Sequence, residues 1–108
     1  MVSAELALAI PTVVAVLVLG LSAVQVGVDK VRCVQAAGLG ARELVRGDAG
    51  PTVLADVTRA APAGSVVSWS GSPVVTVRVS HRARLLGVVD LPIAIDAEAA
   101  GRLESGAP

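Results

Sequence analysis

Aromatic side chains are almost missing from this sequence, which has no Phe, no Tyr and one Trp, Trp69. The rings on which proteins stack unpaired nucleotide bases are therefore absent. Nine Lys and Arg residues balance nine Asp and Glu residues, and they form no basic run that would attract a phosphate backbone. These absences exclude nucleic acid as a partner.

Cysteine and histidine are as scarce, with one of each, Cys33 and His81. A metal site needs several such ligands at short spacings, so we expect no metal and no other cofactor, and a packed or edge role for His81. A single cysteine allows no disulfide within the chain. Two interpretations of Cys33 remain: a thiol that cross-links two chains in an oxidising compartment, or, as we favour, a small buried residue on a helix face.

The third absence is of charge, because no charged residue lies between Glu5 and Asp29. Residues 6–28 read LALAIPTVVAVLVLGLSAVQVGV, and as a helix they would be about 34 Å long, enough to cross a hydrocarbon core of about 30 Å. The segment is longer than the apolar part of a signal peptide, and no basic stretch precedes it. We therefore predict a retained membrane-spanning helix over about 6–28.

Helical character is predicted to continue beyond the membrane, because residues 29–46 contain no Pro and Gly47 suits the end of a helix. Pro11 removes one backbone donor and is expected to kink or loosen the helix over residues 7–10. The charged residues that follow the apolar segment would form the solvated rim where the helix leaves the lipid: Asp29, Lys30 and Arg32.

Small residues recur along this helix at four-residue spacing, which places them on one face and lets another backbone approach closely. The pairs are Ala23 with Gly27, Ala36 with Gly40, and Ala37 with Ala41. They predict helix packing at these positions, although Ala and Gly are abundant throughout the chain.

After Gly47 the pattern predicts one short helix over 51–62 and then three strands, over 65–70, 74–85 and 93–97, with turns around 71–73 and 87–92. The buried stripe of the short helix would consist of Val53, Leu54 and Val57. In the second strand one face would be apolar (Val75, Val77, Val79, Ala83 and Leu85) and the other polar (Thr76, Arg78, Ser80, Arg82 and Arg84).

The predicted fold class is thus α+β, a long N-terminal helix that carries a small head with one short helix and a three-stranded antiparallel sheet. Residues 1–47 would form the helix, 48–99 the head and 100–108 a loose tail.

Catalytic groups are few. The candidate nucleophiles are Ser68, Ser70, Ser72 and Ser80, and no recognisable nucleophile motif accompanies the one histidine. We therefore expect no enzyme activity. A hydrolase would require His81 and a serine to converge in a pocket.

Glu5 allows two interpretations. It could form a simple first helical turn at the membrane interface, with Ser3 as the cap. Alternatively, the free amine of a neighbouring chain's first residue could neutralise it inside a helix bundle, where an unpaired charge would cost several kcal/mol.

Residues 1–11, MVSAELALAIP, resemble the mature N terminus of TadE-like minor pilins of the tight-adherence (Tad) branch of type IV pili. Residues 32–42, RCVQAAGLGAR, resemble the small-residue-rich second half of the helix in that family, and the Val- and Arg-rich hairpin ending at residues 93–95 also fits. The resemblance covers nearly the whole chain. It implies that a prepilin peptidase exposes Met1 as the new N terminus, and that Glu5 pairs with this terminus in assembly.

The resemblance also implies a structural subunit that is anchored in the cytoplasmic membrane before it enters a pilus at the cell surface. Its partners would be the major Flp-type pilin, other minor pilins and the Tad inner-membrane assembly platform. The head would lie outside the cytoplasm, whereas the basic residues that follow the span favour the inside. The alternative is a single-pass membrane protein whose small extracytoplasmic domain binds a ligand and has no role in a filament.

Overall fold

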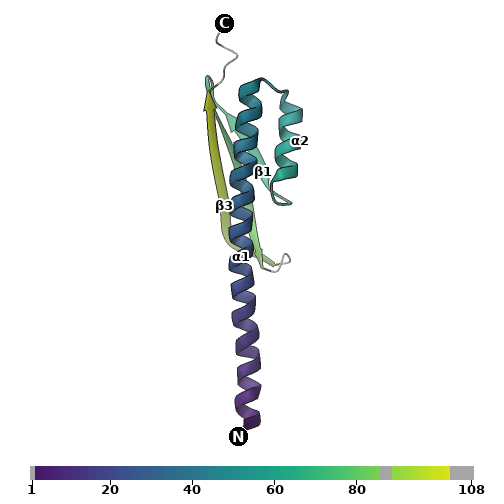
Figure 1. The fold of residues 1–108 in the computed structure, drawn as a ribbon, viewed down its shortest axis with the longest axis vertical. Helices are drawn as coiled ribbons and strands as arrows, with labels where there is room; N and C mark the ends of the chain where they lie inside the picture. Colours follow the sequence, from purple (N-terminus) through teal and green to yellow (C-terminus); the bar gives the residue numbers. More distant parts are fainter. Residues whose placement is uncertain (1, 86–88, 103–108) are drawn as a thin grey trace.

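The computed structural model describes residues 2–85 and 89–102. In chain order the elements are α1 (Val2–Arg46), α2 (Gly50–Ala60), β1 (Val66–Ser70), β2 (Val74–Leu85) and β3 (Val89–Arg102). The first half of α1 projects as a bare rod, and the other elements gather around its second half as a head (Figure 1). The molecule measures 80 × 19 × 18 Å. The predicted α+β architecture is confirmed.

The long helix is unbroken from end to end and includes Pro11, where the sequence predicts a kink or loosening. Pro11 has no N–H for the carbonyl of Ala7. One residue later, the Thr12 hydroxyl donates a 2.7 Å hydrogen bond to the carbonyl of Leu8, an additional bond within the same turn.

The end of α1 is set by Gly47, as predicted. Its φ of +87° lies in the left-handed region that glycine adopts readily. The N–H of Gly47 donates to the carbonyl of Leu44 (3.1 Å), and that of Asp48 donates to the carbonyl of Glu43 (3.0 Å). These two bonds form a Schellman motif, which turns the chain back so that α2 lies beside α1.

Only one side of α2 is buried, through Val53 and Val57. Leu54 is 45% exposed, so its predicted place in the buried stripe is wrong. The reason is geometric: Val53 and Val57, four residues apart, lie on the face of α2 that packs on the core, whereas Leu54 lies about 100° around the helix from Val53.

The sheet has the order β1–β2–β3, with both pairs antiparallel. The predicted alternation along β2 is confirmed for the described side chains, because Val77 and Val79 are fully buried whereas Arg78 is exposed. The side chain of Leu85 and the break predicted at Gly87 lie outside the described residues.

The third strand is longer than predicted at both ends. It passes through Pro92, which lies where the register with β2 shifts between Arg82 and Arg84, so the ladder does not need its missing N–H there. Residues 100–102, predicted as part of a loose tail, pair with the start of β2. Gly101 permits this pairing, because a Cβ at that position would lie 2.7 Å from Cγ2 of Val45 on α1.

The core of the head lies between one face of the sheet and the two helices. It contains Cys33, Ala36, Ala37 and Ala41 of α1, Val53 and Val57 of α2, and Val75, Val77, Val79, Ala83, Ile95 and Ala97 of the sheet. The second half of α1 is therefore part of the head. The opposite face of the sheet is polar and carries the Arg78–Glu98 ion pair.

Candidate functional site

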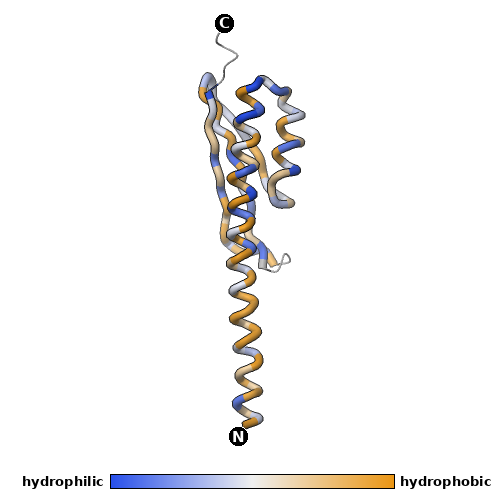
Figure 2. The backbone as a smooth tube through the Cα atoms, viewed as in Figure 1, coloured by the Kyte–Doolittle hydropathy of each residue, from blue (hydrophilic) through white to orange (hydrophobic). Residues whose placement is uncertain are grey.

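The first half of α1 carries an apolar surface that the head does not cover (Figure 2). Its large side chains are exposed, as Leu8 (74%) and Leu19 (67%) illustrate. Burying one Val, Leu or Ile side chain is worth about 1.5–3 kcal/mol, so keeping the whole set in water would cost on the order of 20 kcal/mol. Within the part of the chain that the structure describes, α1 is the one helix long and apolar enough to cross a membrane. This surface therefore needs lipid or other protein around it.

Glu5 lies in the first turn of α1, at the end of the rod far from the head, and it is exposed. Met1, its predicted partner in a neighbouring chain, lies outside the described residues. The pairing of these two residues stays a prediction.

Four of the six small residues predicted for helix packing face the head of the same chain: Ala36, Ala37, Gly40 and Ala41. A Cβ added at Gly40 would lie 2.8 Å from Cγ2 of Val57 and 3.2 Å from Cγ1 of Val77, so only glycine allows α2 and the sheet to come this close. The elements that pack closely against this face therefore belong to the same chain. Ala23 and Gly27, on the rod, are exposed, and their packing against another helix stays a prediction.

Cys33 is fully buried (0% exposed) within the head, as the favoured interpretation of this residue requires. Burial raises the pKa of its thiol, and the negative charges of Asp29 and Asp96 add to the effect, which Lys30 partly opposes. The thiol is therefore protonated and sequestered. A disulfide between two chains at this position would require the head to open.

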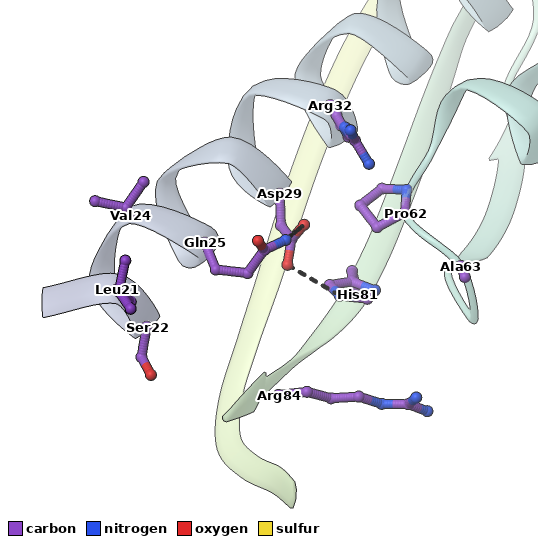
Figure 3. A pocket seen from close by; sticks show the side chains of 10 residues that line it. All are labelled: Leu21, Ser22, Val24, Gln25, Asp29, Arg32, Pro62, Ala63, His81 and Arg84. Carbon is purple, nitrogen blue, oxygen red and sulfur yellow. Dashed lines mark hydrogen bonds and ion pairs between the residues drawn. The ribbon is translucent and has the colours of Figure 1, made fainter. Parts of the chain in front are cut away.

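Asp29, directly after the apolar segment, turns into the protein (Figure 3). It is 5% exposed, and its Oδ2 lies 3.4 Å from Nε2 of His81 on β2. Its Oδ1 accepts a 2.9 Å hydrogen bond from Nε2 of Gln25, one helical turn earlier. The predicted place of Asp29 in a solvated rim is therefore wrong, and the packed position of His81 is confirmed. A charge this deeply buried needs such partners, because an unpaired one would be strongly destabilising.

The second ring nitrogen of His81 faces Ser65, in the segment between α2 and β1. The Ser65 Oγ lies 3.3 Å from Nδ1 of His81 and donates a 2.5 Å hydrogen bond to the carbonyl oxygen of Pro62. Sequence reasoning missed this serine, because only the path of the α2–β1 segment brings it to β2.

Asp29, His81 and Ser65 are the residue types of a hydrolase triad, and the structure brings a histidine and a serine together as that hypothesis required. The Ser65 Oγ contacts both the Pro62 carbonyl oxygen (2.5 Å) and Nδ1 of His81 (3.3 Å), and the contact with Pro62 is the shorter. The three residues connect α1, β2 and the α2–β1 segment. We name this set the junction row.

An open cavity of about 590 Å³ lies beside the junction row, between α1, the α2–β1 segment and β2. Its wall combines apolar side chains of the rod, Leu21 and Val24, with the guanidinium groups of Arg32 and Arg84 (Figure 3). Ser22 also lines it; this residue is 8% exposed, and its Oγ has no hydrogen-bond partner among residues 2–85 and 89–102. The lining residues come from separate segments, which is why no sequence motif indicates the cavity.

Farther along the head, Glu43 of α1 and Asp56 of α2 bring two carboxyl groups together. A hydrogen bond with Asp56 raises the pKa of Glu43; burial and the charges of Asp56 and Asp48 act in the same direction, and Arg46 opposes them. Asp56 also accepts a 3.2 Å hydrogen bond from Arg59. The pair links the two helices best when one carboxyl group is protonated.

No three His, Cys, Asp or Glu side chains gather as a metal ion would require within the described ranges. Comparisons with protein-family models, with curated proteins and with solved structures find no match. The resemblance to TadE-like minor pilins therefore depends on the sequence segments that carry it.

Proposed function

We propose that this protein is a minor-pilin-like structural subunit of a Tad-type pilus, held in the membrane by the first half of α1 before assembly. The observation that supports the proposal best is the division of α1, one unbroken helix whose first half is apolar and exposed and whose second half is packed in the head. Lipid would cover the exposed half first, and other pilin helices would cover it later through apolar burial and close van der Waals contact.

The connection between rod and head suits a subunit that packs in a regular filament. No loop separates them, since α1 passes from one to the other as a single helix. The junction row adds a polar contact at this point, from Asp29 to His81 on β2. A head fixed in this way keeps one orientation relative to its rod, whereas a flexible linker would let it rotate.

Under this proposal the subunit occupies the cytoplasmic membrane with its head outside the cytoplasm, and a prepilin peptidase releases its mature N terminus. Its partners are the major Flp-type pilin, other minor pilins and the inner-membrane assembly platform. Labelling of Ser72→Cys in a Cys33→Ala background tests the orientation. A membrane-impermeant reagent should reach this exposed turn in intact cells, and labelling only after lysis would contradict an external head.

The filament role is tested by Glu5→Ala in the host cell. We expect the variant to reach the membrane at the normal level and to be absent from sheared pili, because its helix cannot pair with a neighbouring N terminus. Glu98→Ala, which removes an exposed carboxylate from the sheet, is the control and should enter filaments normally. Normal incorporation of Glu5→Ala would contradict the proposal.

A second candidate function is a single-pass membrane protein whose head binds a ligand outside any filament. The burial of Ala36, Ala37, Gly40 and Ala41 favours it, because these positions are then not available to a neighbouring helix. The open cavity at the junction also favours it. Absence of the wild-type protein from purified pili, with a normal level in the membrane, would support this second function.

A further inference from the structure

The junction cavity lies at the level where α1 passes from apolar to charged residues. Leu21 and Val24 belong to the apolar segment, whereas Arg32 lies beyond it, and all three line the cavity. In a helix that spans a bilayer, this transition falls in the headgroup region. The apolar part of the wall would therefore face acyl chains, and the basic part would face lipid phosphates.

The basic part of the wall can receive an anion. Arg32 takes part in no ion pair within residues 2–85 and 89–102. Arg84 lies 3.1 Å from Asp90, but both side chains are more than half exposed, and ion pairs of this kind exchange partners at little cost. Asp29 also lines the cavity, and Gln25 and His81 already engage its two oxygens.

Ser22 supplies a second polar position, deeper in the membrane. This residue is nine-tenths buried and lines the cavity, and its Oγ has no hydrogen-bond partner among the described residues. Ser22 and Arg32 are about 15 Å apart along the helix axis at the usual rise. One inorganic phosphate cannot span this distance. A phospholipid can, because its glycerol esters and acyl chains together extend well below its phosphate.

We propose that this cavity binds one anionic phospholipid. The phosphate lies against Arg32, and the glycerol esters and acyl chains extend past Ser22 along Leu21 and Val24. The cavity volume of about 590 Å³ falls within the range of small-molecule sites, roughly 300–1,000 Å³. A lipid held in this way sets the depth of the head on the bilayer. The inference rests on the membrane-anchor part of the proposed function and is independent of the filament role.

The test uses the full chain reconstituted in nanodiscs that contain phosphatidylcholine and phosphatidylglycerol in equal amounts, followed by native mass spectrometry of the lipids that stay bound. The wild type should retain phosphatidylglycerol preferentially. Arg32→Gln should weaken this retention about tenfold, since it removes a charge-assisted contact to phosphate. Ala63→Phe, which fills the cavity from an exposed loop position without changing charge, should have a similar effect.

The matched control is Arg42→Gln, an exposed arginine on the same helix that does not line this cavity. It should retain phosphatidylglycerol as the wild type does, and circular dichroism should show that all variants keep their fold. Equal retention of the two lipids, or equal losses for Arg32→Gln and Arg42→Gln, would overturn the proposal. Displacement of the lipid by inorganic phosphate alone would also overturn it, because the ligand would then be a soluble anion.

Flotation with liposomes separates this proposal from the proposed function. A wild-type chain that does not float with liposomes of either lipid would contradict the membrane anchor itself, and the lipid site with it. A chain that floats with both but retains neither lipid preferentially contradicts the lipid site alone.

Discussion

Asp29 Oδ2 lies 3.4 Å from Nε2 of His81, and this contact joins the first charged residue after the apolar segment to the central strand of the sheet. Both side chains are less than one-tenth exposed. Asp29 Oδ2 and Ser65 Oγ lie against the two ring nitrogens of His81, Nε2 and Nδ1 respectively. The contact therefore holds the sheet against α1 at the point where the rod begins.

Removing either member of this pair should destabilise the head. We expect Asp29→Ala and His81→Ala each to lower the free energy of unfolding by about 3 kcal/mol, because each leaves a buried polar partner alone. The double variant should lose less than the sum of the two. Chemical denaturation of the full chain in detergent micelles measures all three. The exposed pair Arg78 and Glu98 is the control and should show weaker coupling. Additive losses for Asp29 and His81 would contradict the pairing.

Two glycines two residues apart on α1 should respond oppositely to the same substitution. Gly40→Ala should lower stability by about 1–3 kcal/mol, because the new methyl group would lie 2.8 Å from Val57 in a packed core. Gly38→Ala should raise stability by about 0.5–1 kcal/mol, since nothing lies within 4 Å of its Cβ and alanine favours the helix. Thermal unfolding followed by circular dichroism measures both. Similar effects of the two changes would show that α2 and the sheet do not approach Gly40 as described.

Glu43 should make the stability of the head depend on pH. Its folded-state pKa is raised above the ordinary value of 4.5, so the folded protein binds this proton more tightly than the unfolded chain does. The contribution of Glu43 to stability should therefore increase as the pH falls from neutral toward 4.5.

Glu43→Gln tests this dependence, because it removes the repulsion from Asp56 at neutral pH. The variant should be more stable than the wild type there, and its advantage should shrink in mild acid. Glu98→Gln is the control, an exposed carboxylate whose loss breaks the pair with Arg78, and it should give no gain at neutral pH. A loss of stability for Glu43→Gln at neutral pH would contradict the raised pKa.

Cys33 should resist thiol reagents in the folded protein. Its side chain is fully buried, and its raised pKa lowers the fraction of reactive thiolate. A maleimide should label the wild type only after denaturation. In a Cys33→Ala background, Ser72→Cys should react at once, because that turn is exposed. Rapid labelling of native wild-type protein would show that the head opens readily.

Local pattern was sufficient for the elements whose signals lie within a few residues. The uncharged run before Asp29 predicted the rod, Gly47 predicted the end of α1, and alternation along 74–85 predicted which face of β2 is buried. Prediction was weaker for β3. Pro92 indicated a turn before the strand, whereas the strand continues through Pro92 at the point where its register with β2 shifts. Prediction also failed for Leu54, whose exposure depends on how α2 lies against α1.

The amino-acid sequence alone thus determined a long helix with an apolar first half and a small α+β head, because helix length, apolar periodicity and strand alternation are short-range properties. Tertiary packing alone decided that Asp29 turns inward to meet His81, that Ser65 reaches the same ring, and that Ala36 and Gly40 serve the head instead of a neighbouring helix. These contacts join residues far apart in sequence, and only the path of the folded chain brings them within hydrogen-bond or van der Waals range.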